Sequence, residues 1–175
     1  MLKKILIVFL GSILCISSVA QASAQATPSQ KKGGKDNPTI IGALEKVRIL
    51  PENIIYDSRI DTGATTTSIH AGNMEIFERD GKKWVKFDLQ GENKSATVEM
   101  KIKEFRNIKR HGAPDQKRAV VTLHLVLGNV SQEVNVTLND RSKFTYPGLI
   151  GRNFLKPNHL IVDVSEEYTA NPAQK

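Results

Sequence analysis

The chain has 175 residues, of which 25 are lysine or arginine and 18 are aspartate or glutamate, so its formal net charge is +7. Cys15 is the only cysteine. A disulfide framework and a cysteine-based zinc site are therefore excluded, and a hydrophobic core of single-domain size has to hold the fold together.

Residues 1–26 predict a secretory signal peptide. A positive start at Met1-Leu-Lys-Lys precedes a short apolar run from Ile5 to Ile16, and overlapping small-x-small sites follow in residues 20–26. The alternative is a membrane anchor, but the apolar run is shorter than the ~20 residues that a spanning helix needs. We therefore expect an exported protein, either periplasmic or secreted.

Residues 27–39 and 169–175 contain few apolar side chains, so they predict a flexible linker and a disordered tail around a domain at residues 40–168. Within the domain, residues 101–118 contain seven lysines and arginines against two acidic residues. We interpret this segment as a solvated basic loop, with association to an anionic cell-envelope component as the alternative. Nucleic acid is not an expected partner of an exported protein.

Alternation of apolar and polar residues with a period of two predicts β-strands through the middle of the domain. In Trp84–Leu89, for example, Val85, Phe87 and Leu89 share one face. Similar segments are Ala96–Ile102, Val120–Leu127 and Gln132–Leu138, and the turns expected between elements are Asp80-Gly81, Gln90–Asn93, Gly128-Asn129 and Asn139-Asp140.

Arg152–Leu155 is a candidate for a short helix, which Pro157 would stop soon after it starts. No long stretch has helical periodicity. The pattern therefore predicts an all-β fold, either a sandwich or a closed barrel of mostly antiparallel strands.

Two motifs stand out within this β pattern. Asp61-Thr62-Gly63-Ala64 follows the apolar Ile60, and Leu149-Ile150-Gly151-Arg152-Asn153 lies about 90 residues downstream. Together, in this order, they resemble the retropepsin-like aspartic proteases. The wider segments 59–71, 138–155 and 162–165 narrow the resemblance to a bacterial branch labelled ATP-dependent zinc proteases, and the match spans roughly residues 45–165.

The two activities in that label have no motif in this chain. A zinc peptidase of the usual kind carries His-Glu-x-x-His, and this pattern is absent. Gly33-Gly34-Lys35 lacks the spacing of a phosphate-binding loop. We expect no metal and no cofactor. A metal-dependent hydrolase that uses the scattered histidines is the least favoured alternative: His70, His111, His124 and His159.

The resemblance implies an aspartic endopeptidase, in which two carboxylates share one proton because like charges about 3 Å apart cannot both ionise. Asp61, Thr62 and Gly63 are the expected catalytic residues. Asp61 would supply a carboxylate, Gly63 would allow a tight turn and donate its N–H, and Thr62 would brace a partner loop. The expected supports of the site are Ala64, Thr65, Ser68, Leu149, Ile150, Gly151 and Arg152.

The chain contains a single Asp-Thr-Gly, whereas this chemistry needs two aspartates. Asp57 lies upstream on the same segment and is expected to be a strand-start or loop carboxylate. Because viral retropepsins solve the problem as homodimers, the resemblance implies a homodimer that acts on a peptide or protein substrate. The alternative is a non-catalytic module of the same fold that binds a peptide or cell-envelope ligand. Residues 104–118 are a candidate flap over the cleft.

Overall fold

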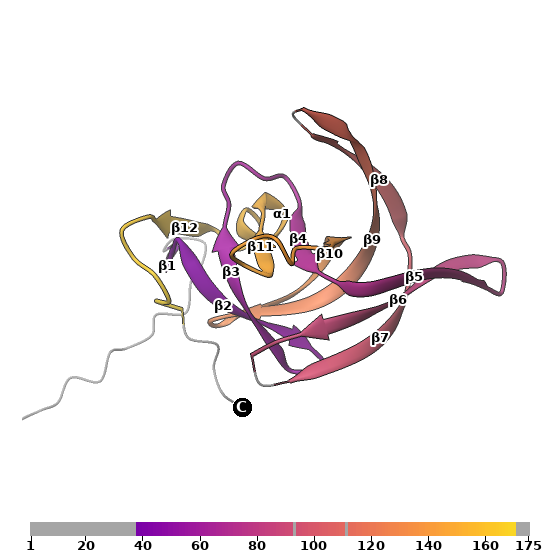
Figure 1. Ribbon diagram of the computed structural model, residues 1–175. Helices are drawn as coiled ribbons and strands as arrows, with labels where there is room; N and C mark the ends of the chain where they lie inside the picture. The colour runs from indigo at the N-terminus through magenta and orange to yellow at the C-terminus, as the bar shows by residue number, and fades with distance from the viewer. Residues whose placement is uncertain (1–37, 93, 111, 171–175) are drawn as a thin grey trace, which may run out of the picture. The chain divides into compact units, whose positions relative to one another are not determined.

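The computed structural model describes residues 38–92, 94–110 and 112–170 (Figure 1). The predicted signal peptide, all but the end of the predicted linker and most of the predicted tail lie outside these residues. Strands dominate the described part of the chain, and one short helix, α1 (Arg152–Leu155), lies at the predicted position. The all-β prediction is confirmed.

The central element is a sheet that closes into a barrel. Its strands follow the order β10-β4-β11-β3-β2-β9, and β9 also pairs with β10, which joins the two ends. The strands of the barrel are β2 (Leu44–Leu50), β3 (Ile54–Ile60), β4 (Thr67–His70), β9 (Ala113–Leu127), β10 (Val130–Asn139) and β11 (Gly148–Ile150). Closure removes the free edges of these strands, so no barrel strand offers a long unpaired backbone.

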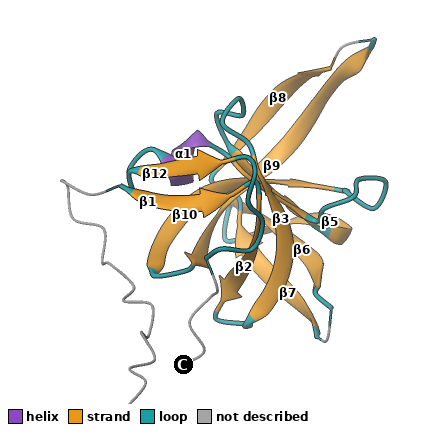
Figure 2. Cartoon of the chain, turned by 90° about the vertical axis from the view of Figure 1, so that its left-hand side faces the viewer, coloured by secondary structure: helices purple, strands orange, loops and turns teal. Residues whose placement is uncertain are grey.

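Two smaller sheets accompany the barrel (Figure 2). A three-stranded antiparallel sheet has the order β5-β6-β7, and a two-stranded parallel sheet joins β1 to β12. Their bounds are β5 (Gly72–Arg79), β6 (Lys82–Gln90), β7 (Ser95–Lys101), β1 (Thr39–Gly42) and β12 (Leu160–Asp163). Asp80 and Gly81 connect β5 to β6 with positive φ angles of 51° and 67°, the conformation of a type I′ hairpin turn.

The hydrophobic core contains the face that the alternation predicted. Val85, Phe87 and Leu89 of β6 are fully buried, while Trp84, Lys86 and Asp88 on the other face of the strand are not. Barrel strands contribute further large buried side chains, among them Tyr56 of β3 and Leu125 of β9, and α1 contributes Phe154. The period-two pattern therefore identified the inward side of this strand correctly.

The basic segment 101–118 is not a loop. Most of it forms a hairpin of β8 (Glu104–Arg110) and the first half of β9, and the hairpin projects away from the barrel in both views (Figures 1 and 2). Of the two strands in this hairpin, the sequence pattern predicted only Val120–Leu127, the second half of β9. The charged residues before them do not show the apolar alternation of a half-buried strand.

Asp57 also differs from its expected role. It lies within β3 rather than at a strand start or in a loop, and it faces Lys46 of β2 in the antiparallel register. The Lys46 Nζ atom lies 3.0 Å from the Asp57 Oδ1 atom. A cross-strand ion pair therefore accounts for this carboxylate.

Glu45 ties the end of the described chain to its beginning. Its carboxylate is fully buried. Oε1 accepts hydrogen bonds from the Gly42 N–H (2.7 Å), the Thr169 N–H (3.2 Å) and the Thr169 hydroxyl (2.8 Å), and Oε2 accepts one from the Ala170 N–H (3.0 Å). Thr169 and Ala170 were expected to lie in the disordered tail, but these hydrogen bonds hold them in place. A buried carboxylate is stable only when hydrogen-bond donors of this kind surround it.

We predict that Glu45→Gln destabilises the domain by about 1–3 kcal/mol, because an amide cannot accept bonds at both of its terminal atoms and one buried N–H loses its partner. Urea unfolding would measure the change as a lower midpoint at an unchanged slope. Glu133→Gln, at an exposed position of β10, is the control and should leave the midpoint almost unchanged. Equal shifts in the two variants would contradict the role of Glu45.

Candidate active site

Asp61 opens the loop that connects β3 to β4. Its backbone N–H donates to the Ile150 carbonyl at 2.9 Å, which continues the pairing of β3 with β11. Its Oδ1 atom accepts hydrogen bonds from the Gly63 and Ala64 N–H groups, both at 2.9 Å. The loop therefore folds around its own carboxylate, as aspartates in tight turns commonly do.

The second carboxylate oxygen of Asp61 has a different environment. Oδ2 makes no hydrogen bond within the described residues, and the side chain is only half-buried. A Cβ atom at position 63 would lie 3.2 Å from Oδ1, so glycine keeps the turn close to the carboxylate. One oxygen holds the turn while the other can face a ligand.

A second loop packs against the first, because β11 lies between β3 and β4. β11 runs parallel to β3 and antiparallel to β4, and the chain turns at Gly151 into α1. The Arg152 N–H donates to the Ala64 carbonyl at 2.9 Å, and the Asn153 N–H donates to the Thr65 carbonyl at 3.2 Å. The two predicted motifs therefore lie side by side in the fold.

Gly151 lies where the two loops approach each other closely. A Cβ atom there would lie 2.7 Å from the carbonyl carbon of Thr66 and 3.0 Å from the carbonyl oxygen of Ala64, distances that no side chain tolerates without a shift. Ile150, immediately before it, is fully buried behind the loop, and Leu149 is partly buried. Glycine is required here by close approach of the backbone.

Arg152 clamps the Asp61 loop from outside. Its Nη1 atom donates to the carbonyl oxygens of Thr62 (2.9 Å) and Gly63 (2.6 Å), and Nη2 donates to the Thr65 hydroxyl (3.0 Å). The rigid fork of a guanidinium group suits such multiple acceptors. Thr62 thus contributes its carbonyl to the clamp, while its hydroxyl has no partner among the described residues.

Thr67 is the buried link between the loops. Its hydroxyl donates to Asn153 Oδ1 at 2.8 Å and accepts from the Gly151 N–H at 3.1 Å. Its backbone N–H donates to the same Asn153 oxygen at 2.8 Å, and Asn153 Nδ2 reaches the Asn135 carbonyl of β10 at 2.8 Å. These bonds join β4, β10 and the start of α1.

Sequence analysis placed polar support at Ser68 and did not identify Thr67 or Asn153. The Ser68 hydroxyl is buried without a hydrogen-bond partner in the described part of the chain. Neighbouring side chains of a strand point to opposite faces, so only one of the two hydroxyls can reach the 151–153 turn. Asn153 is the last residue of the downstream motif Leu149–Asn153, and its place in that motif is the feature of the sequence that points to a role in the site.

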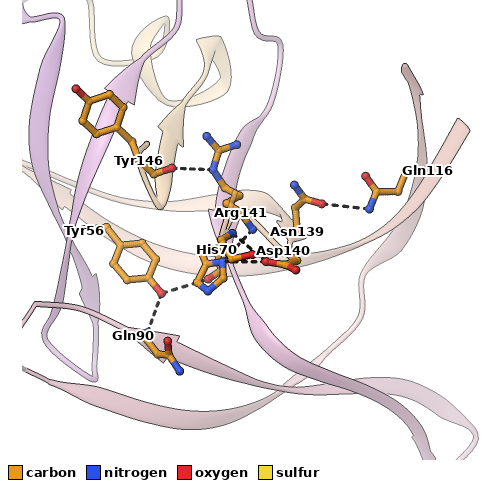
Figure 3. A network of polar contacts seen from close by, with 9 residues as sticks. Tyr56, His70, Gln90, Gln116, Asn139, Asp140, Arg141 and Tyr146 are labelled. Atoms are coloured by element: carbon orange, nitrogen blue, oxygen red, sulfur yellow. Dashed lines mark hydrogen bonds and ion pairs between the residues drawn. The ribbon is translucent and has the colours of Figure 1, made fainter. Parts of the chain in front are cut away.

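A second polar network lies at the other end of β4 (Figure 3). The Tyr56 hydroxyl donates to the His70 carbonyl at 3.2 Å and accepts from the Gln90 N–H at 2.9 Å. Burial raises the pKa of Tyr56 to about 12, against the opposite effect of the Gln90 bond. His70 Nδ1 accepts the Arg141 N–H at 2.9 Å, so the neutral ring carries its proton on Nε2. This network fixes the start of the segment that leads from β10 into β11.

The candidate flap contacts the Asp61 loop directly. Arg106 of β8 donates from Nη1 to the Thr66 hydroxyl at 2.7 Å. The base of the β8–β9 hairpin is thereby attached next to the loop that carries Asp61.

In the described part of the chain, three or more His, Cys, Asp or Glu side chains do not gather closely enough to hold a metal ion. No helix within residues 38–92, 94–110 and 112–170 is long and apolar enough to cross a membrane.

Comparison with known proteins gives a family and a fold. Residues 40–173 match the family model described as RimB-like, "Retropepsin-like aspartic endopeptidase RimB". A solved structure of a Legionella pneumophila protein of unknown function, Lpg0085, has a TM-score of 0.66 and 27% sequence identity, and the alignment covers 77% of this chain and 100% of that one. The resemblance and the retropepsin-like fold predicted from the two motifs are confirmed.

Curated relatives carry a different name. Two proteins named probable alpha-L-glutamate ligase, from Shewanella pealeana and Shewanella halifaxensis, are each 36% identical to this chain over 138 residues. The aligned part covers 76% of this chain but only 30% of each relative, so the chain matches less than a third of their length.

We predict that Thr67→Val destabilises the protein by about 1–3 kcal/mol, because the variant keeps the side-chain shape but leaves the Gly151 N–H without its acceptor in a buried position. Ser68→Ala is the matched control, since the Ser68 hydroxyl makes no hydrogen bond in the described residues. Chemical denaturation of both variants tests this difference. A larger loss for Ser68→Ala would show that the link between the loops is assigned to the wrong hydroxyl.

Proposed function

Because the chain belongs to the RimB-like family of retropepsin-like aspartic endopeptidases, we propose that it hydrolyses peptide bonds with two Asp61 carboxylates, one from each subunit of a homodimer. The observation that carries the proposal is the Asp61 turn. One carboxylate oxygen is held by two backbone N–H groups, and the other has no partner among the described residues. The loop is braced by the downstream motif, which gives the preorganisation that a catalytic carboxylate needs.

In the proposed reaction, one Asp61 carboxylate is ionised and the other carries the shared proton. The ionised group takes a proton from a water molecule, whose oxygen bonds to the carbonyl carbon of the peptide. The protonated group donates a hydrogen bond to the carbonyl oxygen. The carbon–nitrogen bond then breaks, and the leaving amine receives a proton from the pair, which restores the shared-proton state.

The surface around β1 and β12 supports the homodimer. These strands pair only with each other in the described residues, and they expose apolar side chains that a monomer would leave in water. Ile40 of β1 is 62% exposed and Ile161 of β12 is 51% exposed, and Val164, which follows β12, is 82% exposed. Exposed apolar side chains beside open strand edges are typical of interaction surfaces, and a twofold interface would place identical surfaces against each other.

We also propose export to the periplasm or the exterior, on the basis of residues 1–26. The substrate is a peptide or protein. The ligase name of the longer relatives is not carried over, because the matched part spans only 30% of their length.

A non-catalytic peptide-binding module of the same fold is the second candidate. It is favoured by the single Asp-Thr-Gly in the chain, because a monomer would hold only one of the two carboxylates. The two candidates differ in one measurable property, which is whether activity requires two intact copies of Asp61.

We predict that Asp61→Asn lowers peptidase activity by about 100-fold or more while the fold stays intact, because the amide keeps the shape of the carboxylate but cannot accept the proton of water. Mass spectrometry of an unstructured peptide mixture would measure cleavage. Asp57→Asn, which removes a carboxylate engaged with Lys46, is the control and should keep activity. Full activity of Asp61→Asn would refute the aspartic mechanism, and loss with a chelator followed by recovery with zinc would favour a metal-dependent hydrolase.

We further predict the result of mixing equal amounts of wild-type and Asp61→Asn chains after dissociation and reassociation. Random pairing would leave about a quarter of the dimers with two intact carboxylates, so activity should fall to about a quarter of that of the same total amount of wild-type protein. An active monomer would instead retain half. Sedimentation velocity on the same samples would establish the oligomeric state. The same measurement on two further variants tests the interface: Ile40→Glu should weaken the dimer more than Ile76→Glu, which changes an exposed isoleucine of β5.

A further inference from the structure

Arg141 is a buried cation without a matching anion. It lies between β10 and β11 and is only 7% exposed. Its Nε atom donates to the Tyr146 carbonyl at 3.1 Å, and its guanidinium carbon lies 4.6 Å from the centre of the Phe144 ring. Neither contact supplies a negative charge, and Nη1 and Nη2 have no hydrogen-bond acceptor among the described residues.

The nearest carboxylate in sequence is used elsewhere. Asp140 accepts the Ser142 N–H at 2.9 Å and lies 3.8 Å from His70 Nδ1. Figure 3 shows the Arg141 guanidinium group directed away from both His70 and Asp140. In the described residues, no carboxylate forms an ion pair with Arg141.

Arg118 brings a second cation to the same place. Its Nε and Nη2 atoms donate to Gln116 Oε1 at 3.0 and 2.8 Å. Gln116 Nε2 in turn donates to Asn139 Oδ1 at 3.2 Å, two residues before Arg141, as Figure 3 shows. Burial, and to a smaller extent the charge of Arg118, lowers the pKa of Arg141. The hydrogen-bond chain therefore places Arg118 beside the segment that carries Arg141.

A buried charge is unfavourable unless a partner of opposite sign compensates it, and the planar guanidinium fork matches the two oxygens of a carboxylate or phosphate. The Nη1 and Nη2 atoms of Arg141 reach solvent, so a ligand can approach them. We propose that Arg141 and Arg118 form an oxyanion-binding site that accepts the carboxylate or phosphate group of a ligand.

The site lies beside the Asp61 loop. Arg118 faces Arg106 in the β8–β9 register, and Arg106 donates to the Thr66 hydroxyl at 2.7 Å. The segment that carries Arg141 leads directly into β11, which pairs with β3 up to Ile60. An anion bound here is either a free ion or an acidic side chain of a peptide bound at the Asp61 loop. The second source rests on the proposed function, whereas anion binding itself does not.

Calorimetric titration of the full chain at constant ionic strength tests the proposal. The probes are inorganic phosphate and a capped peptide with one aspartate, compared with the same peptide containing asparagine. All titrations use the Asp61→Asn background, so that peptide cleavage cannot disturb the measurement and a failure of the catalytic proposal leaves this test intact. We expect saturable binding of phosphate, of the aspartate peptide, or of both.

Arg141→Gln should weaken that binding about tenfold or more, the effect of losing charged hydrogen bonds. Lys143→Gln is the matched control, because it removes an exposed positive charge from the same segment and should leave the affinity unchanged. Arg118→Gln provides a second test if Arg141→Gln does not fold, and it should also weaken binding.

The outcomes separate the two sources of the anion. Phosphate binding without preference between the peptides identifies a site for a free anion, and preference for the aspartate peptide identifies a subsite for an acidic side chain. Absence of saturable binding for every probe would overturn the proposal. Equal losses in Arg141→Gln and Lys143→Gln would also overturn it, because they would indicate general charge attraction.

Discussion

The hydrogen bonds of Thr67 with the turn at Gly151 and Asn153 hold the candidate site together. They join residues that are 84 to 86 positions apart in the chain, and Thr67 itself is fully buried. Asp61 lies at the start of the loop that this link closes, and Arg152 fixes the outer side of the same loop. The position of the carboxylate is thus a property of both motifs, and neither motif alone would define it.

The barrel makes this link geometrically possible. β11 has only three residues, yet it pairs with β3 on one side and with β4 on the other. Ile150 therefore meets the start of the Asp61 loop, and Gly151 meets Thr67 where that loop ends. Gly148 is the first residue of this strand and Gly151 follows its last residue. A side chain at Gly148 would collide with Ser58, and one at Gly151 would collide with the backbone of Thr66. Small residues at these points allow the backbones to approach as closely as the site requires.

Two buried charges show how differently the fold treats ionic groups. The carboxylate of Glu45 accepts four hydrogen bonds. Through them it links Thr169 and Ala170, at the end of the described chain, to Gly42 near its beginning. Arg141 donates to one carbonyl and stacks on Phe144, and no described residue neutralises it. A buried charge with partners supports the architecture, whereas a buried charge without a partner of opposite sign is a feature of binding sites.

The sequence by itself determined the strand faces, the hairpin turn and the two motifs, because these depend on residues close together in the chain. Val85, Phe87 and Leu89 alternate as a half-buried strand must, and Asp80-Gly81 adopts the positive φ angles that its residue types favour. Only the tertiary structure decided that Thr67 rather than Ser68 braces the site, that the basic segment 101–118 is a hairpin, and that Glu45 holds Thr169. Each of these depends on which distant strand lies alongside and which face it presents, and the local pattern of apolar and polar residues carries no information about that choice.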